Sequence, residues 1–155
     1  MNGTIPATGH LLGAADIRRI AADAGISPTK KFGQNFVIDP GTVRRIVRET
    51  GVTAADHVME VGPGLGSLTL AILETGATMT AVEIDPPLAE RLPGTVAEFM
   101  PEATSRLTVV NRDALTVTPE NVLMIQYFVS QVGPYVTVIF PVDTTCFQAL
   151  TYPFF

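Results

Sequence analysis

Residues 60–66, Glu-Val-Gly-Pro-Gly-Leu-Gly, decide the fold of this 155-residue chain. The run of residues 56–61, which ends inside this stretch, predicts a buried parallel strand. Residues 67–74, which follow the stretch, have helical apolar spacing without an interior breaker. Alternating glycines therefore stand where a strand passes into a helix. A backbone without Cβ atoms can turn tightly there and let a ligand approach the main chain beside the free N–H groups of the helix. The stretch predicts a nucleotide-type pocket in an α/β fold.

The spacing of the three glycines indicates which ligand the pocket takes. A dinucleotide loop has the pattern G-x-G-x-x-G, whereas Gly62, Gly64 and Gly66 follow G-x-G-x-G. Glu60 stands two residues before the first glycine, where a carboxylate would repel a pyrophosphate but suits a ligand that carries an ammonium and a sulfonium. We favour S-adenosylmethionine, with Gly62 and Gly64 in its binding loop. A dinucleotide and a purely structural glycine turn are the alternatives.

Acidic residues end two further predicted strands. Residues 78–83 form an alternating strand whose last residue, Glu83, lies about 20 residues after the glycine loop, where a Rossmann-type unit places its ribose-binding carboxylate. Residues 107–110 form a third strand that runs toward Asp113. Because open α/β sheets bind ligands at the carboxyl ends of their strands, we expect Glu83 to bind the ribose and Asp113 to accept a hydrogen bond from the adenine amino group.

Composition limits the class of protein. A chain of 155 residues with 46% hydrophobic residues is typical of one folded α/β domain and argues against disorder. Cys146 is the single cysteine, so no internal disulfide is possible, and the N-terminal sequence lacks a signal-like apolar run. These features predict a cytoplasmic protein. His10 and His57 are isolated in the sequence, and we expect no metal site.

Charge is unevenly distributed along the chain. The net charge is -5, but residues 1–50 hold seven basic against four acidic residues and the remainder holds three against eleven. A basic segment beside a cofactor loop is what contact with a phosphate backbone needs. Solvated arginine-rich helix faces would explain the same pattern.

A second motif makes a family resemblance specific. Residues 30–39 read K-K-F-G-Q-N-F-V-I-D. Together with residues 60–66, the string Glu83-Ile84-Asp85 and Asp113, this motif resembles the ribosomal RNA adenine dimethyltransferases, which dimethylate two adjacent adenines near the 3′ end of small-subunit rRNA. The resemblance covers residues 14–120. The glycine loop is shared by many methyltransferases, whereas the K-K-x-G-Q-N-F-x-x-D string is nearly private to this family and its erythromycin-resistance and mitochondrial relatives.

The resemblance implies a Rossmann-like, S-adenosylmethionine-dependent methyltransferase fold and a set of site residues. It places Asn35 and Val37 over the cofactor and Lys30 and Lys31 toward RNA. The partner it implies is small-subunit rRNA or a 30S-type ribosomal particle, with no membrane and no metal. The expected cofactor-binding positions are Asn35, Val37, Gly62, Gly64, Glu83 and Asp113.

The last part of the chain departs from the family pattern. Residues 121–155 contain one charged residue, Asp143, and eight of the eleven aromatic residues. We therefore divide the chain into a cofactor-binding methyltransferase part, residues 1–120, and a divergent hydrophobic tail, residues 121–155. The methyltransferase fold is expected to be incomplete at its C-terminus.

A catalytic motif of the family is also altered. The fourth strand should end in an Asn-Leu-Pro-Tyr type motif, whose Asn and Pro orient the target amino group while the Tyr stacks on the base. The nearest match is Val132-Gly133-Pro134-Tyr135, and Val132 has no polar atom to offer. We expect weak cofactor binding and no methyl transfer by this chain. The alternative function is a noncatalytic RNA- or ribosome-binding module that keeps the fold.

Three explanations of the tail stay open from sequence. It is the product of a truncated or frame-shifted coding sequence, or a pair of strands at residues 124–132 and 135–142 around a Gly133-Pro134 turn. A membrane segment over residues 122–142 is the third, disfavoured by its glutamines and prolines and by the lack of basic flanks.

Overall fold

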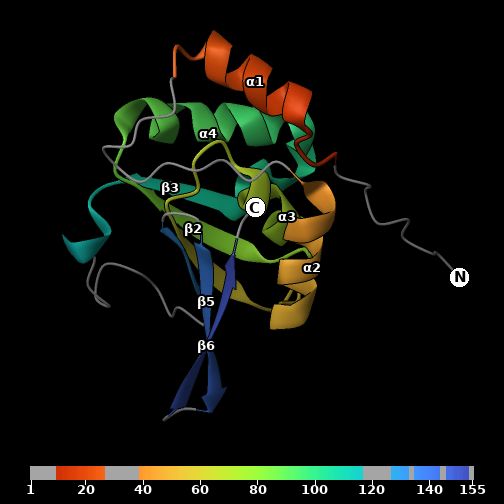
Figure 1. The fold of residues 1–155 in the computed structure, drawn as a ribbon, viewed down its shortest axis with the longest axis vertical. Coiled ribbons are helices and arrows are strands. Elements are labelled where there is room, and N and C mark those ends of the chain that lie inside the picture. The colour runs from red at the N-terminus through yellow and green to blue at the C-terminus, as the bar shows by residue number, and fades with distance from the viewer. Residues whose placement is uncertain (1–9, 27–38, 117–126, 133–134, 144–145, 154–155) are drawn as a thin grey trace, which may run out of the picture.

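The computed structural model describes residues 10–26, 39–116, 127–132, 135–143 and 146–153, the last three ranges as strands only (Figure 1). They form one six-stranded sheet, ordered β3-β2-β1-β4-β5-β6, with helices packed on it. The helices are α1 (Ala14–Asp23), α2 (Pro40–Thr50), α3 (Ser67–Glu74) and α4 (Pro86–Phe99), with short 3-10 turns η2 (Pro101–Arg106) and η3 (Ala114–Thr116). The strands are β1 (His57–Val61), β2 (Thr78–Glu83), β3 (Leu107–Asn111), β4 (Tyr127–Val132), β5 (Tyr135–Asp143) and β6 (Cys146–Pro153).

The first half of the sheet is parallel and confirms the predicted α/β class. Strand β1 pairs in parallel with β2, and β2 pairs in parallel with β3. The connections run through α3 and α4. Helix α3 and strand β2 have the predicted bounds, whereas β1 begins one residue later than predicted and β3 ends one residue later. Because these strands are parallel, their carboxyl ends share one edge of the sheet, where ligands bind in open α/β folds.

The tail continues this sheet. Strand β4 pairs in parallel with β1 on the side opposite to β2, and β5 and β6 follow as antiparallel neighbours. The predicted strand pair is therefore confirmed, with β4 and β5 in place of residues 124–132 and 135–142. Residues 124–126 and the Gly133-Pro134 turn lie outside the described residues. In Figure 1, β5 and β6 extend downward beyond the helices. Over the described ranges, none of the helices is long and apolar enough to cross a membrane.

The core lies between the sheet and the helices and is centred on α3. Residues 67–73 are buried without interruption, which is expected of a helix that is hydrophobic all round. Helices α1, α2 and α4 add apolar side chains to the same cluster, and a smaller cluster around Met59 and Val82 covers the opposite face of the sheet. The largest fully buried apolar side chains include Leu12, Ile20, Ile46, Leu68, Leu70, Ile72, Met79 and Leu88.

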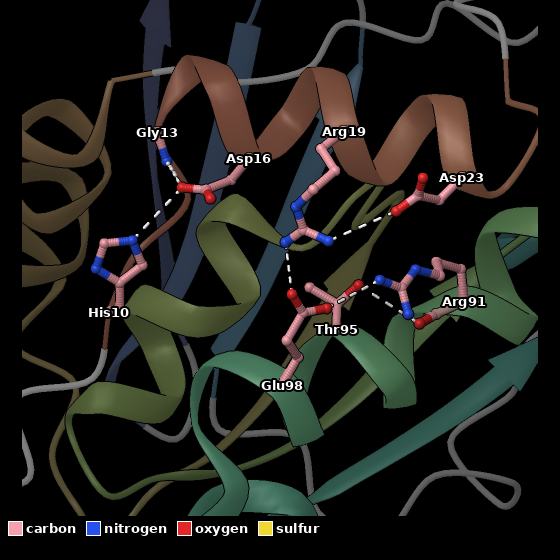
Figure 2. A network of polar contacts seen from close by, with 8 residues as sticks. All are labelled: His10, Gly13, Asp16, Arg19, Asp23, Arg91, Thr95 and Glu98. Carbon is pink, nitrogen blue, oxygen red and sulfur yellow. Dashed lines mark hydrogen bonds and ion pairs between the residues drawn. The ribbon is translucent and has the colours of Figure 1, made fainter.

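Helix α1 is held on α4 by a polar network (Figure 2). Glu98 on α4 accepts hydrogen bonds from Arg19 on α1, at 2.5 Å, and from Arg91 on its own helix, at 3.1 Å. The His10 ring, just before α1, stacks on Phe99 with ring centroids 5.6 Å apart. Helix α1, which precedes residues 27–38 in the chain, is therefore attached to α4.

Candidate cofactor-binding site

The glycine loop connects β1 to α3 in a left-handed backbone conformation. Gly62, Gly64 and Gly66 have φ of +72°, +58° and +99°. The Gly62 N–H donates to the Val82 carbonyl on β2 at 2.9 Å, and the Gly66 N–H donates to the Pro63 carbonyl at 3.0 Å. The loop is therefore tied to the end of β2 and folded back on itself.

Gly66 needs to be glycine for a second reason. A Cβ atom built on Gly66 would lie 2.8 Å from Leu92 Cδ1 on α4. Side chains do not pack that closely, so a side chain at this position would require Leu92 to shift.

Glu83 lies directly beside the glycine loop. Its side chain is only 4% exposed. Its Oε2 accepts a hydrogen bond from the Gly64 N–H at 3.2 Å, and its Oε1 accepts one from the Asp85 N–H at 2.9 Å. Burial raises the pKa of Glu83, and these two backbone donors counteract part of that increase. A carboxylate accepts up to about four hydrogen bonds, so Glu83 keeps capacity for a further donor, as a ribose-binding role requires.

Asp113 follows β3 at the same edge of the sheet. It is exposed, and its Oδ1 accepts a hydrogen bond from the Leu115 N–H at 2.9 Å. The end of β3 is fastened to the end of β2, because Asn111 Nδ2 and the Arg112 N–H donate to the Glu83 carbonyl at 2.8 and 3.0 Å. The fold therefore brings the two predicted carboxylates to neighbouring strand ends.

Glu60 is a buried carboxyl group below the loop. It is 0% exposed, and its Oε2 accepts a hydrogen bond from Thr69 Oγ1 on α3 at 2.6 Å. Its Oε1 has no hydrogen-bond partner in the part of the chain that the structure describes. Burial raises the pKa of Glu60 to about 7; the Thr69 hydrogen bond opposes this increase, and the nearby Glu83 charge adds to it. A buried carboxyl oxygen without a partner fits a site that receives a cationic ligand.

The other predicted site residues are not described by the structure. Asn35, Val37, Lys30 and Lys31 lie within residues 27–38, outside the described residues. That segment joins α1 to α2, whose N-cap residue Asp39 accepts a hydrogen bond from the Thr42 N–H at 2.7 Å. The roles of these four residues therefore stay predictions.

Two exposed apolar side chains beside the carboxylates were missed by the sequence reasoning. Ile84 follows Glu83 and is 44% exposed, and Leu115 lies two residues after Asp113 and is 93% exposed. They are the exposed large hydrophobic residues of the described part. Their positions next to predicted ligand carboxylates were a usable signal, since apolar walls with a few polar groups are typical of small-molecule sites. Within the same residues, no cluster of three potential metal ligands is present.

A parallel sheet with a glycine loop after β1 and acidic residues after β2 and β3 defines the S-adenosylmethionine-dependent methyltransferase fold. Among solved structures, the 23S rRNA methyltransferase ErmE is similar at 25% identity with a TM-score of 0.50, over 62% of this chain and 47% of that chain. Residues 26–137 match the family model of ribosomal RNA adenine dimethylases. The chain belongs to the ribosomal RNA adenine dimethylase family, as the resemblance in its motifs predicts.

Curated relatives agree with this assignment. The chain is 98% identical to ribosomal RNA small subunit methyltransferase A of Bifidobacterium longum subsp. infantis over 122 residues, which are 79% of this chain and 40% of the relative. It is 66% identical to the protein of the same name from Leifsonia xyli subsp. xyli over 109 residues, 70% of this chain and 39% of the relative. The chain thus spans about 40% of the length of these relatives.

Proposed function

We propose that this chain carries the S-adenosylmethionine-binding part of an rRNA adenine N6-dimethyltransferase. The observation that carries the proposal is the position of Glu83, a buried carboxylate held against the Gly64 N–H at the edge where the sheet binds ligands. Membership of the ribosomal RNA adenine dimethylase family supports the same cofactor. The orphaned Glu60 Oε1 supports a ligand that brings positive charge.

The described residues suit the parts of this cofactor. Glu83 binds the two ribose hydroxyls, and Asp113 accepts a hydrogen bond from the adenine amino group. Ile84 and Leu115 supply apolar surface for the flat faces of the adenine, which their exposure leaves free for contact. Gly62 lets the ligand approach the main chain. Asn35, Val37 and Gly64 complete the proposed cofactor-binding set.

Methyl transfer requires the protein mainly to position the reacting groups. The bound cofactor supplies an electrophilic methyl group on its sulfonium. Residues of the site hold the cofactor in one orientation, and well-oriented reacting groups reach effective molarities of about 10⁵ to 10⁸ M. The target adenine must leave its stack to reach the pocket, as in other enzymes that modify bases.

The proposed substrate is adenine N6 of small-subunit rRNA within a cytoplasmic 30S-type particle. Lys30 and Lys31 are the proposed RNA contacts, because they are adjacent positive charges beside the cofactor motif and neutralising phosphates is the main source of nucleic-acid affinity. In the second candidate function, the chain binds rRNA without methyl transfer. Val132 favours this second function. It is the last residue of β4, the strand next to β1, and stands at the position where the family motif has Asn.

Substitution of Glu83 tests the cofactor site. Glu83→Ala is expected to weaken S-adenosylmethionine binding by about 10- to 100-fold, because hydrogen bonds to a charged group contribute roughly 1.5 to 3 kcal/mol. Titration calorimetry on the full chain measures the change. Glu90→Ala is the matched control, since Glu90 is an exposed glutamate on α4. Unchanged affinity in Glu83→Ala would remove Glu83 from the site, and displacement of the cofactor by NAD would favour a dinucleotide site instead.

A further inference from the structure

A surface hollow of about 220 Å³ lies between α2 and α3, away from the cofactor site. Its apolar lining consists of Val47, Val52 and Ala71, of which Val47 and Ala71 are buried. Val52 and Thr75, which also line it, precede β1 and β2 in the chain. Because these two strands are parallel, the hollow lies where they begin, on the side of the sheet opposite to the glycine loop and Glu83.

Two arginines of α2, Arg44 and Arg48, stand one helical turn apart at the rim of this hollow. Arg44 Nε and Nη2 each donate a hydrogen bond to the Glu74 carboxylate of α3 at 3.0 Å. This bidentate pair fixes the plane of the Arg44 guanidinium. The Arg44 side chain remains 48% exposed, so a ligand in the hollow can reach that plane.

Arg48 is the arginine of α2 that the described residues leave without a carboxylate partner. Arg44 is paired with Glu74 at 3.0 Å, and Arg45 is paired with Glu49 at 3.1 Å. Arg48 is exposed. Its place in the last turn of α2 suits the helix dipole, which any cation would satisfy. An arginine adds a planar fork of donors that matches the oxygens of a phosphate group.

The size and charge of the hollow select the chemistry of its ligand. Its volume is below the roughly 300 to 1,000 Å³ of sites for drug-sized molecules, which suits a single planar ring system. The C-terminal ends of α2 and α3, at Thr50 and Glu74, flank it, and their partial negative charge keeps an anion out of the interior. An apolar ring therefore enters the hollow, while a phosphate outside it binds Arg48. An unstacked RNA nucleotide supplies both groups, and such bases stack on arginine planes.

We propose that the hollow binds one unstacked base of the substrate RNA, with the base against the Arg44 guanidinium and its phosphate on Arg48. This inference rests on the proposed function, because it takes RNA as the partner. The proposed RNA contacts Lys30 and Lys31 precede α2 in the chain, and the 11 residues of this helix span about 16 Å. The hollow thus adds a second RNA contact toward the C-terminal end of α2, apart from the site of methyl transfer.

Substitution of Arg48 tests the phosphate contact. Arg48→Gln should weaken binding of a single-stranded RNA of about ten nucleotides roughly fivefold at about 0.1 M salt and lower the log-log salt slope by roughly 0.7, because one counterion-releasing contact is lost. Arg48→Lys keeps the charge and should keep the slope. Arg18→Gln is the matched control, since Arg18 is an exposed arginine of α1 that does not line the hollow. Fluorescence anisotropy on the full chain measures affinity and slope.

Two further measurements test the base contact. Val52→Ser removes apolar surface from the hollow but no charge, so it should weaken RNA binding severalfold and leave the salt slope unchanged. The same RNA carrying 4-thiouridine should form photocrosslinks within residues 44–52 or 71–75. Thermal unfolding verifies that each variant is folded. The affinity of each variant for S-adenosylmethionine should be unchanged, because the hollow and the cofactor site lie on opposite sides of the sheet.

The outcomes separate this inference from the proposed function. Equal changes of slope in Arg48→Gln and Arg18→Gln, or crosslinks that fall only outside residues 44–52 and 71–75, would overturn the hollow as an RNA site and leave the cofactor site in place. Tighter binding of an oligoglutamate peptide than of RNA, lost in Arg48→Gln, would overturn it in favour of an acidic protein partner. A chain that binds S-adenosylmethionine but no RNA would refute the RNA partner and this inference with it, whereas a folded chain that binds no S-adenosylmethionine would refute the proposed cofactor site.

Discussion

At the scale of single residues, the glycine loop combines a polar contact with a restricted backbone. It brings the Gly64 N–H to 3.2 Å from the Glu83 carboxylate, and Gly66 has φ of +99° with Leu92 close to the place where a Cβ would lie. The partners in both contacts come from other elements of the fold.

Gly66→Ala is expected to destabilise the fold. Alanine at φ +99° occupies a region that costs about 1 to 3 kcal/mol, and its Cβ would meet Leu92 Cδ1 at 2.8 Å. The midpoint of urea unfolding should fall accordingly. Gly41→Ala is the matched control, because a Cβ at Gly41 makes only an ordinary contact with Asp39, at 3.5 Å, and alanine favours the helix. Equal loss of stability in both variants would contradict the role given to Gly66.

At the scale of elements, α1 is joined to α4 by a polar and aromatic contact in addition to its buried Ile17 and Ile20. Arg19 pairs with Glu98 and lies with its Cζ 5.9 Å from the centroid of the Phe99 ring. A single exposed ion pair contributes little to stability, but here Arg19 contacts both the Glu98 carboxylate and the Phe99 ring, and Arg91 binds the same carboxylate. Since α1 precedes the predicted binding segment, residues 27–38, its attachment bears on the cofactor site.

Arg19→Ala is expected to loosen α1 without unfolding the sheet. Amide hydrogen exchange should accelerate over residues 14–23 and stay unchanged in β1 and α3, because local openings follow the number of contacts that hold each element. Arg18→Ala is the matched control, since Arg18 is the exposed neighbour on the same helix. If both variants exchange alike over α1, the network with Glu98 and Phe99 does not hold the helix.

At the scale of the whole molecule, the tail completes the sheet around β1. Strand β4 covers the β1 edge next to the glycine loop, so the edge is not left unpaired beside the site. The same strand ends at Val132, one strand from the loop, where the family motif supplies Asn. The backbone of the sheet is thus continuous around β1, whereas the residue at the end of β4 differs from the family motif.

The unmodified chain is therefore expected to transfer no methyl group to rRNA. Without the oriented acceptor, loss of one positioning contact of about 3 kcal/mol already lowers the rate some hundredfold. The assay follows labelled methyl from S-adenosylmethionine into undermethylated small subunits, with a full-length curated relative as the positive control. Transfer within tenfold of that control would refute the expectation and make Val132-Gly133-Pro134-Tyr135 a working motif.

The strands β1, β2 and β3, the helix α3 and the family were predictable from the sequence by itself. Apolar periodicity and glycine chemistry act over a few neighbouring residues, so β1, the glycine loop, α3 and β2 follow from their own stretch, as do Glu83 and Asp113 at strand ends. The private motif at residues 30–39 identified the family, and the matching family model confirms it. For the tail, the sequence left strands, a membrane segment and an altered reading frame open.

Only the tertiary structure decided which side chains are buried together and which distant segments of the chain are neighbours. That Glu60 is fully buried with one oxygen unpaired depends on α3 and β2 packing around it. The contact of Arg19 with Glu98 joins residues 79 apart, and the pairing of β4 with β1 joins segments about as distant. Burial and long-range pairing are set by the packing of the whole chain, because no local pattern specifies which distant surface will cover a given side chain.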